Sequence, residues 1–179
     1  MQGFLVAALL LTLIAAATDL RSGEIPQWLT LAGLVGGPVA HLIYAAVRMP
    51  GTSALAEGGY SILGIIACAF VPLVLYRQDA IGGGDVKLLA AIGAVLQPRL
   101  GFEVQVYAFF AAGLIAPARL AYEGKLFRTL KNVVLIATNP VLPKSKRRSI
   151  EPTLMTWFRF GPAIFLGTLL VAYLHWRTR

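Results

Sequence analysis

Six uncharged, mostly apolar runs separate the charged residues of this 179-residue chain. A helix needs about 20 predominantly apolar residues to cross the hydrocarbon core of a bilayer. Four of the runs approach or exceed this length: Met1–Thr18, Ile25–Val47, Gly58–Tyr76 and Phe160–Trp176. A fifth, Val104–Ala118, is slightly short and can borrow flanking residues. The run Leu88–Pro98 is too short to span unaided, so we expect a short or broken helix that begins near Asp85.

The composition also favours a membrane protein. Apolar residues make up 58% of the chain and charged residues 13%, about half the usual charged share of a soluble domain. A soluble protein of this size could not bury so much apolar surface. We therefore predict an all-α, polytopic membrane helical bundle with about six transmembrane helices, formed by residues 1–179 as a single domain. A chain with one cysteine, Cys68, has no disulfide framework.

The lysine and arginine residues predict the orientation, because cytoplasmic loops carry an excess of them. If the N-terminus lies outside, twelve of the 16 basic residues fall on the inner side and four on the outer side. This topology places segments 19–27, 77–87 and 119–152 at the cytoplasmic face of the inner (plasma) membrane. The basic cluster Lys144–Arg148 lies in the last of these segments, where contact with anionic lipid is a better explanation than a nucleic-acid partner.

Two of the eight acidic residues stand apart from the others. Asp19 follows directly on the first apolar run, and Asp85 leads into the short one. An ionisable residue at membrane depth is costly and is a functional candidate by default. The alternatives are a juxtamembrane charge paired with Arg21 for Asp19, and a helix N-cap for Asp85. Because both aspartates are predicted to lie at the cytoplasmic face, a shared site is the better explanation.

Three consecutive glycines, Gly82, Gly83 and Gly84, precede Asp85. Such a run costs backbone entropy and offers no side chain for packing. One reason for it is the close approach of another backbone, because an extended peptide can pair with an open glycine strand. The alternative is a flexible turn between two helices.

Two aspartates that meet in a partly desolvated cleft can hydrolyse an amide bond. Like charges at close range cannot both ionise, so the pair shares one proton. The ionised carboxyl takes a proton from water and the protonated one donates to the scissile carbonyl oxygen, with no metal and no cofactor. The sequence has no HExxH zinc pattern, no GxSxG nucleophile elbow and no Walker-type phosphate loop. Solvated surface or packing roles are expected for Glu57, Glu103, His41 and His175.

These motifs together resemble those of the type IV prepilin peptidases. The segment Gly82–Leu88, GGGDVKL, resembles the family's GxGD signature with its following Lys-Leu. Asp19 ahead of Ile25-Pro26 resembles the first catalytic aspartate of the family, and Phe160–Gly167 is similar to its late Gly-Pro element. The resemblance implies a membrane aspartic endopeptidase that removes the short basic leader from pilin-like precursors at the cytoplasmic membrane face.

The resemblance also implies roles for individual residues. Asp19 and Asp85 would form the catalytic pair. Residues that would bind substrate or shape the site are Gly82, Gly83, Gly84, Lys87 and Pro26. The implied partners are the precursor, whose own apolar helix lies in the membrane, and the lipid bilayer.

One departure from the larger members of the family concerns their paired CxxC motifs, which are associated with zinc and with N-methylation of the new terminus. The single cysteine of this chain means that methyltransferase activity is not expected. In this respect the chain resembles the short peptidases of Flp/Tad-type pili and the archaeal preflagellin peptidases.

Two other functions are compatible with a pair of membrane aspartates. A presenilin-like GxGD protease would act on other membrane peptides, but that family pairs GxGD with a Tyr-Asp motif, whereas Thr18 precedes Asp19 here. A small proton or cation carrier would use Asp19 and Asp85 as relay groups. A carrier should place them near the bilayer midplane, whereas here they fall at the ends of predicted spans.

Overall fold

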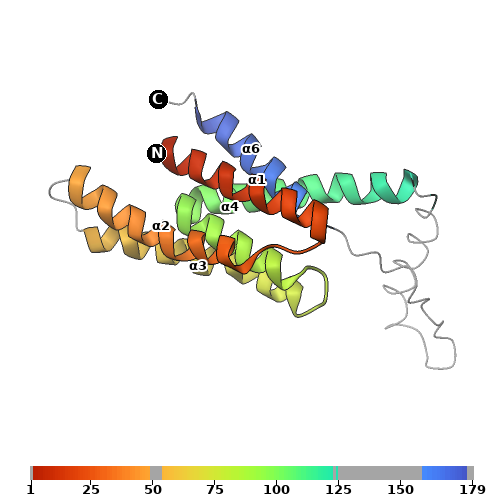
Figure 1. Ribbon diagram of the computed structural model, residues 1–179, viewed down its shortest axis with the longest axis horizontal. Helices are drawn as coiled ribbons and strands as arrows, with labels where there is room; N and C mark the ends of the chain where they lie inside the picture. Colours follow the sequence, from red (N-terminus) through yellow and green to blue (C-terminus); the bar gives the residue numbers. More distant parts are fainter. Residues whose placement is uncertain (1, 49–53, 123, 125–158, 177–179) are drawn as a thin grey trace. The chain divides into compact units, whose positions relative to one another are not determined.

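The computed structural model describes residues 2–48, 54–122, 124 and 159–176. These residues form helices and connecting turns, without a strand (Figure 1). The helices are α1 (Gln2–Ser22), α2 (Gln27–Arg48), α3 (Ala54–Tyr76), α4 (Gly83–Tyr122) and α6 (Gly161–Trp176). Four helical stretches are long and apolar enough to cross a membrane, namely α1, α2, α3 and residues 83–118 of α4, whereas α6 is shorter. The predicted all-α membrane bundle is confirmed.

The chain divides into two compact units. The first comprises Met1–Ala112 and Arg159–Arg179, and the second comprises Gly113–Phe158. Of the second unit the structure describes the last part of α4 and Gly124. Most of the segment 119–152, including the basic cluster Lys144–Arg148, lies outside the described residues. The features below belong to the first unit.

Helix α4 reverses its direction at Gln97, which has non-helical dihedral angles (φ 64°, ψ 173°). In a straight helix Gly93 and Gly101 would be about 12 Å apart along the axis. Instead, a Cβ atom built on Gly101 would lie 2.9 Å from the Cα of Gly93. The helix is therefore a hairpin of a first arm, residues 83–96, and a second arm that begins at Pro98. The expected short helix is the first arm, although it starts two residues before Asp85.

Side chains from other helices satisfy the backbone carbonyls that the reversal leaves without a helical partner. The Ala94 carbonyl would accept the N–H of residue 98, but that residue is a proline. The Ser61 hydroxyl of α3 donates to this carbonyl at 2.6 Å. The His41 ring of α2 bonds the neighbouring Val95 carbonyl at 3.0 Å through Nε2. Polar residues of α2 and α3 thus stabilise the end of the first arm.

The helices place Asp19 and Gln97 at opposite ends of the first unit. Helices α1 and α6 run antiparallel side by side (Figure 1), because the end of α1 contacts the start of α6, while Gln2 and Trp176 line one pocket. The described helices pass between the two ends six times, counting both arms of α4. Whether every pass crosses a bilayer remains a prediction.

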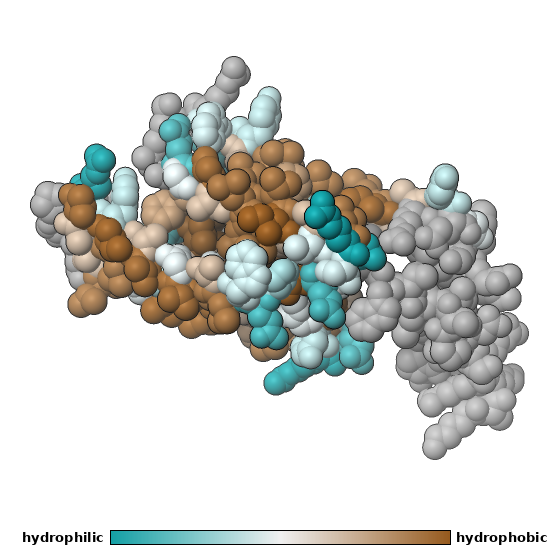
Figure 2. All heavy atoms as spheres, in the orientation of Figure 1, coloured by the Kyte–Doolittle hydropathy of each residue, from teal (hydrophilic) through white to brown (hydrophobic). Residues whose placement is uncertain are grey.

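Large apolar side chains cover much of the outer surface. Figure 2 shows mostly hydrophobic residues on the face in view, and exposed examples include Val35, Ile66 and Phe70, each more than 60% accessible. A monomeric soluble protein rarely exposes such extensive apolar surface. Many of the buried positions hold small residues, among them Ala8, Ala15 and Ala91, as is typical where membrane helices pack without a hydrophobic driving force. These features identify a multi-pass membrane protein.

Two adjacent glycines of α2 provide a matched test of this packing. A Cβ on Gly37 would lie 2.6 Å from the backbone carbonyl carbon of Ala94, whereas a Cβ on Gly36 would meet nothing within 4 Å. We expect Gly37→Ala to lower the free energy of unfolding by about 1–3 kcal/mol through overpacking. Gly36→Ala should be neutral, or stabilising by up to about 1 kcal/mol. Thermal unfolding of both variants in micelles measures the difference, and equal melting temperatures would contradict this packing.

Candidate active site

Asp19 lies in the last turn of α1 and is 5% exposed. The helix ends just after it, because Gly23 takes a left-handed conformation (φ 74°) and donates its N–H to the Asp19 carbonyl at 2.9 Å. The Asp19 carboxylate accepts the backbone N–H of Gly161, the first residue of α6, at 2.9 Å through Oδ2. Among the described residues Asp19 forms no ion pair with Arg21. Its partner is a helix N-terminus, where a negative charge is favoured.

The close contact between α1 and α6 requires a glycine at position 161. A Cβ there would lie 2.8 Å from Oδ2 and 2.9 Å from Cβ of Asp19. Pro162 follows in the first turn, where its missing N–H costs no helical hydrogen bond. The late Gly-Pro element of the sequence therefore binds and positions the Asp19 carboxylate. The Arg159 guanidinium, two residues earlier, donates to the Leu20 carbonyl and ties the same two segments together.

Asp85 occupies the first turn of α4 and is 9% exposed. Its Oδ2 accepts the N–H of Gly82 at 3.1 Å, while its own N–H donates to the Gly82 carbonyl at 3.1 Å. The carboxylate contact is one half of a capping box, with Gly82 at the N-cap and Asp85 at the third helical position, while the second bond is a tight backbone turn. Asp85 is thus not the N-cap residue itself. Among the described residues neither aspartate has a hydrogen-bond partner for its second oxygen, Oδ1.

The glycine run is not an open strand in this structure, because Gly83 and Gly84 form the first turn of α4. Each lies against a neighbouring segment. A Cβ on Gly84 would lie 3.4 Å from Cβ of Ile25, and a Cβ on Gly83 would lie 3.4 Å from the Tyr76 ring. The contact with Ile25 brings the start of α4 next to the turn that follows Asp19.

The three sequence motifs therefore meet at one end of the first unit. Asp19 contacts Gly161 directly, Ile25 lies beside Gly84, and Asp19 is close enough to Asp85 to act on it electrostatically. Pro26 is half-buried at the start of α2, where its carbonyl accepts the N–H groups of Leu29 and Thr30. Lys87 is exposed.

Two residues of this region have no motif in the sequence that marks them as part of a site. Arg159 is one of 16 basic residues, and its partner is a backbone carbonyl of a segment 139 residues away. Tyr76, the last residue of α3, packs on the glycine run. Within the described part of the chain no three His, Cys, Asp or Glu side chains lie together as a metal site would require. The expectation of metal-free chemistry remains a prediction.

The fold and the site define a class of protein, namely a polytopic helical membrane protein with two buried aspartates near each other at one end of the bundle. The comparison with known families identifies the family within this class. The model of the type IV leader peptidase family matches residues 5–117, more than half of the chain. The chain belongs to this family, which confirms the resemblance drawn from its motifs.

Three characterised relatives support the assignment. The chain is 33% identical over 91 residues to the leader peptidase HopD of Salmonella typhimurium, covering 51% of the chain and 57% of the relative. It is 40% identical over 81 residues to a prepilin leader peptidase/N-methyltransferase of Dickeya chrysanthemi, covering 45% of the chain and 28% of the relative. A prepilin leader peptidase/N-methyltransferase of Aeromonas hydrophila is 38% identical over 94 residues, which cover 51% of the chain and 32% of the relative.

The matches thus span between 28% and 57% of the length of these relatives. No solved structure matches the chain significantly.

Proposed function

We propose that this protein is a membrane aspartic endopeptidase that removes the short basic leader from pilin-like precursors. The observation that carries the proposal is the convergence of Asp19, Asp85 and Gly161 from three segments that are distant in sequence. Family membership and the names of the relatives support it. They favour it over a presenilin-like protease and over a proton or cation carrier.

In the proposed mechanism Asp19 and Asp85 act as a general acid–base pair. Close carboxyls hold one proton between them, and the two titrations belong to the pair rather than to either residue. The ionised member accepts a proton from the attacking water, and the other donates to the scissile carbonyl oxygen. The Gly161 and Gly82 N–H groups orient the two carboxylates through Oδ2, so each Oδ1 can face water or substrate.

The surrounding residues would support this chemistry in different ways. Gly82 caps α4 and fixes Asp85, whereas Gly83 and Gly84 allow Tyr76 and Ile25 to approach the start of that helix. Pro26 would hold the turn between α1 and α2. The exposed Lys87 would contact lipid head groups or the precursor.

The proposed site faces the cytoplasm from the inner membrane. The excess of lysine and arginine at the ends of the segments that carry Asp19 and Asp85 supports this orientation. The leader of a precursor would then reach the aspartates from the cytosol while its apolar helix approaches laterally through the bilayer. Precursors of Flp/Tad-type pili are the proposed substrates.

Cleavage of a purified precursor tests the function. We expect the protein, reconstituted in vesicles, to release the leader from a pilin-like precursor at a single bond ahead of the apolar helix, as mass spectrometry of both products would show. The matched control is the same apolar helix without its leader, which should stay intact. Cleavage inside the control helix would instead support a presenilin-like protease.

A further inference from the structure

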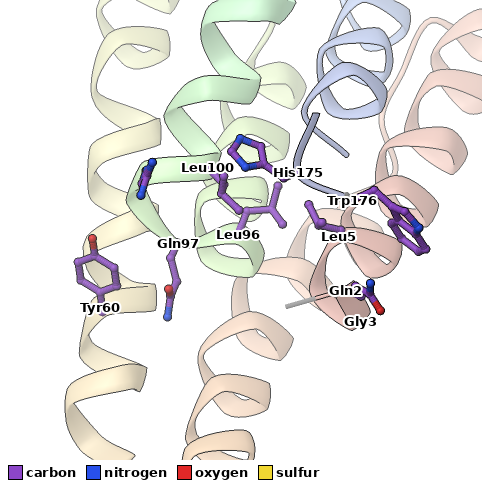
Figure 3. A pocket seen from close by; sticks show the side chains of 10 residues that line it. Gln2, Gly3, Leu5, Tyr60, Leu96, Gln97, Leu100, His175 and Trp176 are labelled. Carbon is purple, nitrogen blue, oxygen red and sulfur yellow. The ribbon is translucent and has the colours of Figure 1, made fainter. Parts of the chain in front are cut away.

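A cavity lies at the end of the first unit opposite the aspartates (Figure 3). Its volume is about 820 Å³. Figure 3 shows Tyr60 reaching it from α3, Gln97 and Leu100 from the bend of α4, and His175 and Trp176 from the end of α6. The polar and aromatic residues that line it are Gln2, Tyr60, Gln97, Arg99, His175 and Trp176.

The distance along α1 separates this cavity from the candidate active site. Gln2 lines the cavity and Asp19 belongs to the active site, and 17 residues of one helix correspond to roughly 25 Å. That distance is close to the thickness of the hydrocarbon core of a bilayer. A ligand of the cavity therefore cannot touch the aspartates and would lie at the level of the other leaflet.

The cavity favours an anionic group. Arg99 and His175 line it, and no carboxylate belongs to its lining among the residues that the structure describes. The Arg99 side chain is 81% exposed, and its Nε pairs with Glu103 at 3.8 Å. Within the described part of the chain this pair does not involve the two terminal nitrogens of the guanidinium, which can reach a ligand. The Glu103 carboxylate behind the cavity bonds the His175 ring at 2.7 Å.

A second network fixes the wall of the cavity at Gln97. Its side-chain amide donates to Glu57 at 2.9 Å and lies 3.3 Å from Nδ1 of His41. The His41 ring in turn stacks on Phe4 at 4.0 Å. Because these residues come from α1, α2, α3 and α4, this wall is held from four sides before any ligand arrives.

An apolar groove between α1 and α6 adjoins the cavity at Trp176. It has a volume of about 270 Å³ and shares Trp176 with the cavity. The groove is lined by Leu9, Leu169, Ala172, Tyr173 and Trp176. Leu9 and Leu169 are each seven residues from the cavity end of their helix, so the groove reaches about 10 Å toward the middle of the bundle.

We propose that the cavity and the groove together bind one anionic phospholipid of the leaflet opposite the aspartates. The lipid phosphate would pair with Arg99 in the cavity, and an acyl chain would fill the groove between α1 and α6. Trp176 lines both the cavity and the groove, and Tyr60 lines the cavity, where aromatic residues are typical of a membrane interface. The lipid would link α6, whose start seats Asp19, to the bend of α4. This proposal does not depend on the peptidase function.

Native mass spectrometry of the intact protein, delipidated in detergent and then given lipid, tests the proposal. The probes are phosphatidylglycerol, phosphatidylcholine and inorganic phosphate. We expect one tightly held phosphatidylglycerol, weaker phosphatidylcholine and no retained phosphate. Arg99→Gln should weaken the binding of phosphatidylglycerol about fivefold, because this is the typical contribution of one basic residue to the affinity for an anionic lipid surface. Arg48→Gln, at an exposed arginine outside the cavity, should leave it unchanged.

The groove is tested by a second pair of variants. Leu169→Trp fills the groove, whereas Leu170→Trp places the same ring on a similarly exposed neighbour outside it. We expect only Leu169→Trp to reduce lipid retention, with melting temperatures that agree between the two. Equal lipid binding by Arg99→Gln and Arg48→Gln, or by Leu169→Trp and Leu170→Trp, would overturn the proposal. Retention of inorganic phosphate alone, or of phosphatidylcholine as tightly as phosphatidylglycerol, would overturn it as well.

Discussion

Asparagine in place of either Asp19 or Asp85 is expected to abolish leader cleavage while the protein still accumulates in the membrane. A general acid or base contributes roughly 10²- to 10⁴-fold to the rate of a reaction, and an amide at these positions neither takes nor gives the required proton. The amide oxygen of asparagine can still accept the N–H of Gly161 or of Gly82, so the local fold should survive. The cleavage rate of a reconstituted precursor and an immunoblot of the membrane fraction measure the two effects.

Asp79→Asn provides the matched control for these variants. Asp79 is an exposed carboxylate in the turn before the glycine run, with a positive φ of 55° that asparagine tolerates well. Its replacement should leave cleavage unchanged. Full processing by Asp19→Asn or by Asp85→Asn would defeat the assignment of that residue. Proton flux into vesicles that either substitution abolishes, without any cleavage by the native protein, would instead favour a carrier.

The positions of the helices follow closely from the apolar runs, because membrane helices need long uncharged segments. The run Met1–Thr18 predicts most of α1, and the short helix expected from the run Leu88–Pro98 is present as the first arm of α4, which ends at the reversal at Gln97. The residues that hold the reversal were not predicted. Ser61 and His41 meet the Ala94 and Val95 carbonyls only because α2 and α3 turn these faces toward α4. A single sequence does not reveal which helix faces meet.

At the candidate site, too, the sequence predicts some features and leaves others unpredicted. Its aspartates stand out in the sequence because charges at membrane depth are rare. Their immediate partners are backbone N–H groups, which every segment carries and which therefore leave no mark in the sequence. For Asp19 the nearest basic side chain, Arg21, was the obvious alternative partner, yet the bonded group is an N–H 142 residues away.

Two residues for which no specific polar contact was expected also form such contacts. Glu57 was expected at a solvated surface and His41 in a packing role. His41 does pack, on Phe4, but both residues also bond Gln97 at the reversal of α4. The signal that could have pointed to them is the Gln97-Pro98 pair, because a proline inside an apolar run leaves a carbonyl that some other helix must satisfy.

The contact between Gly161 and Asp19 leads to the second large effect. Gly161→Ala should reduce the turnover rate of leader cleavage about 10²-fold, because a displacement of about 1 Å of a reacting group costs that much. The added methyl group would lie 2.8 Å from Oδ2 and 3.2 Å from Cγ of Asp19, so the carboxylate has to move. Unlike the aspartate substitutions, this variant keeps both carboxyl groups and the N–H donor.

Three measurements on Gly161→Ala distinguish a role in positioning Asp19 from a general loss of structure. The affinity for the precursor should stay near that of the native protein while the turnover rate falls. The melting temperature should fall about as far as that of Gly37→Ala, because the Cβ atom of Asp19 is also only 2.9 Å away. Gly37→Ala overpacks a contact away from the aspartates and should cleave at the native rate. Gly36→Ala, which adds the same methyl group in open space on α2, should cleave normally. If Gly161→Ala cleaves as fast as Gly36→Ala, then the hydrogen bond between α6 and Asp19 serves only to join two helices, and the carboxylate that matters must be oriented by something else.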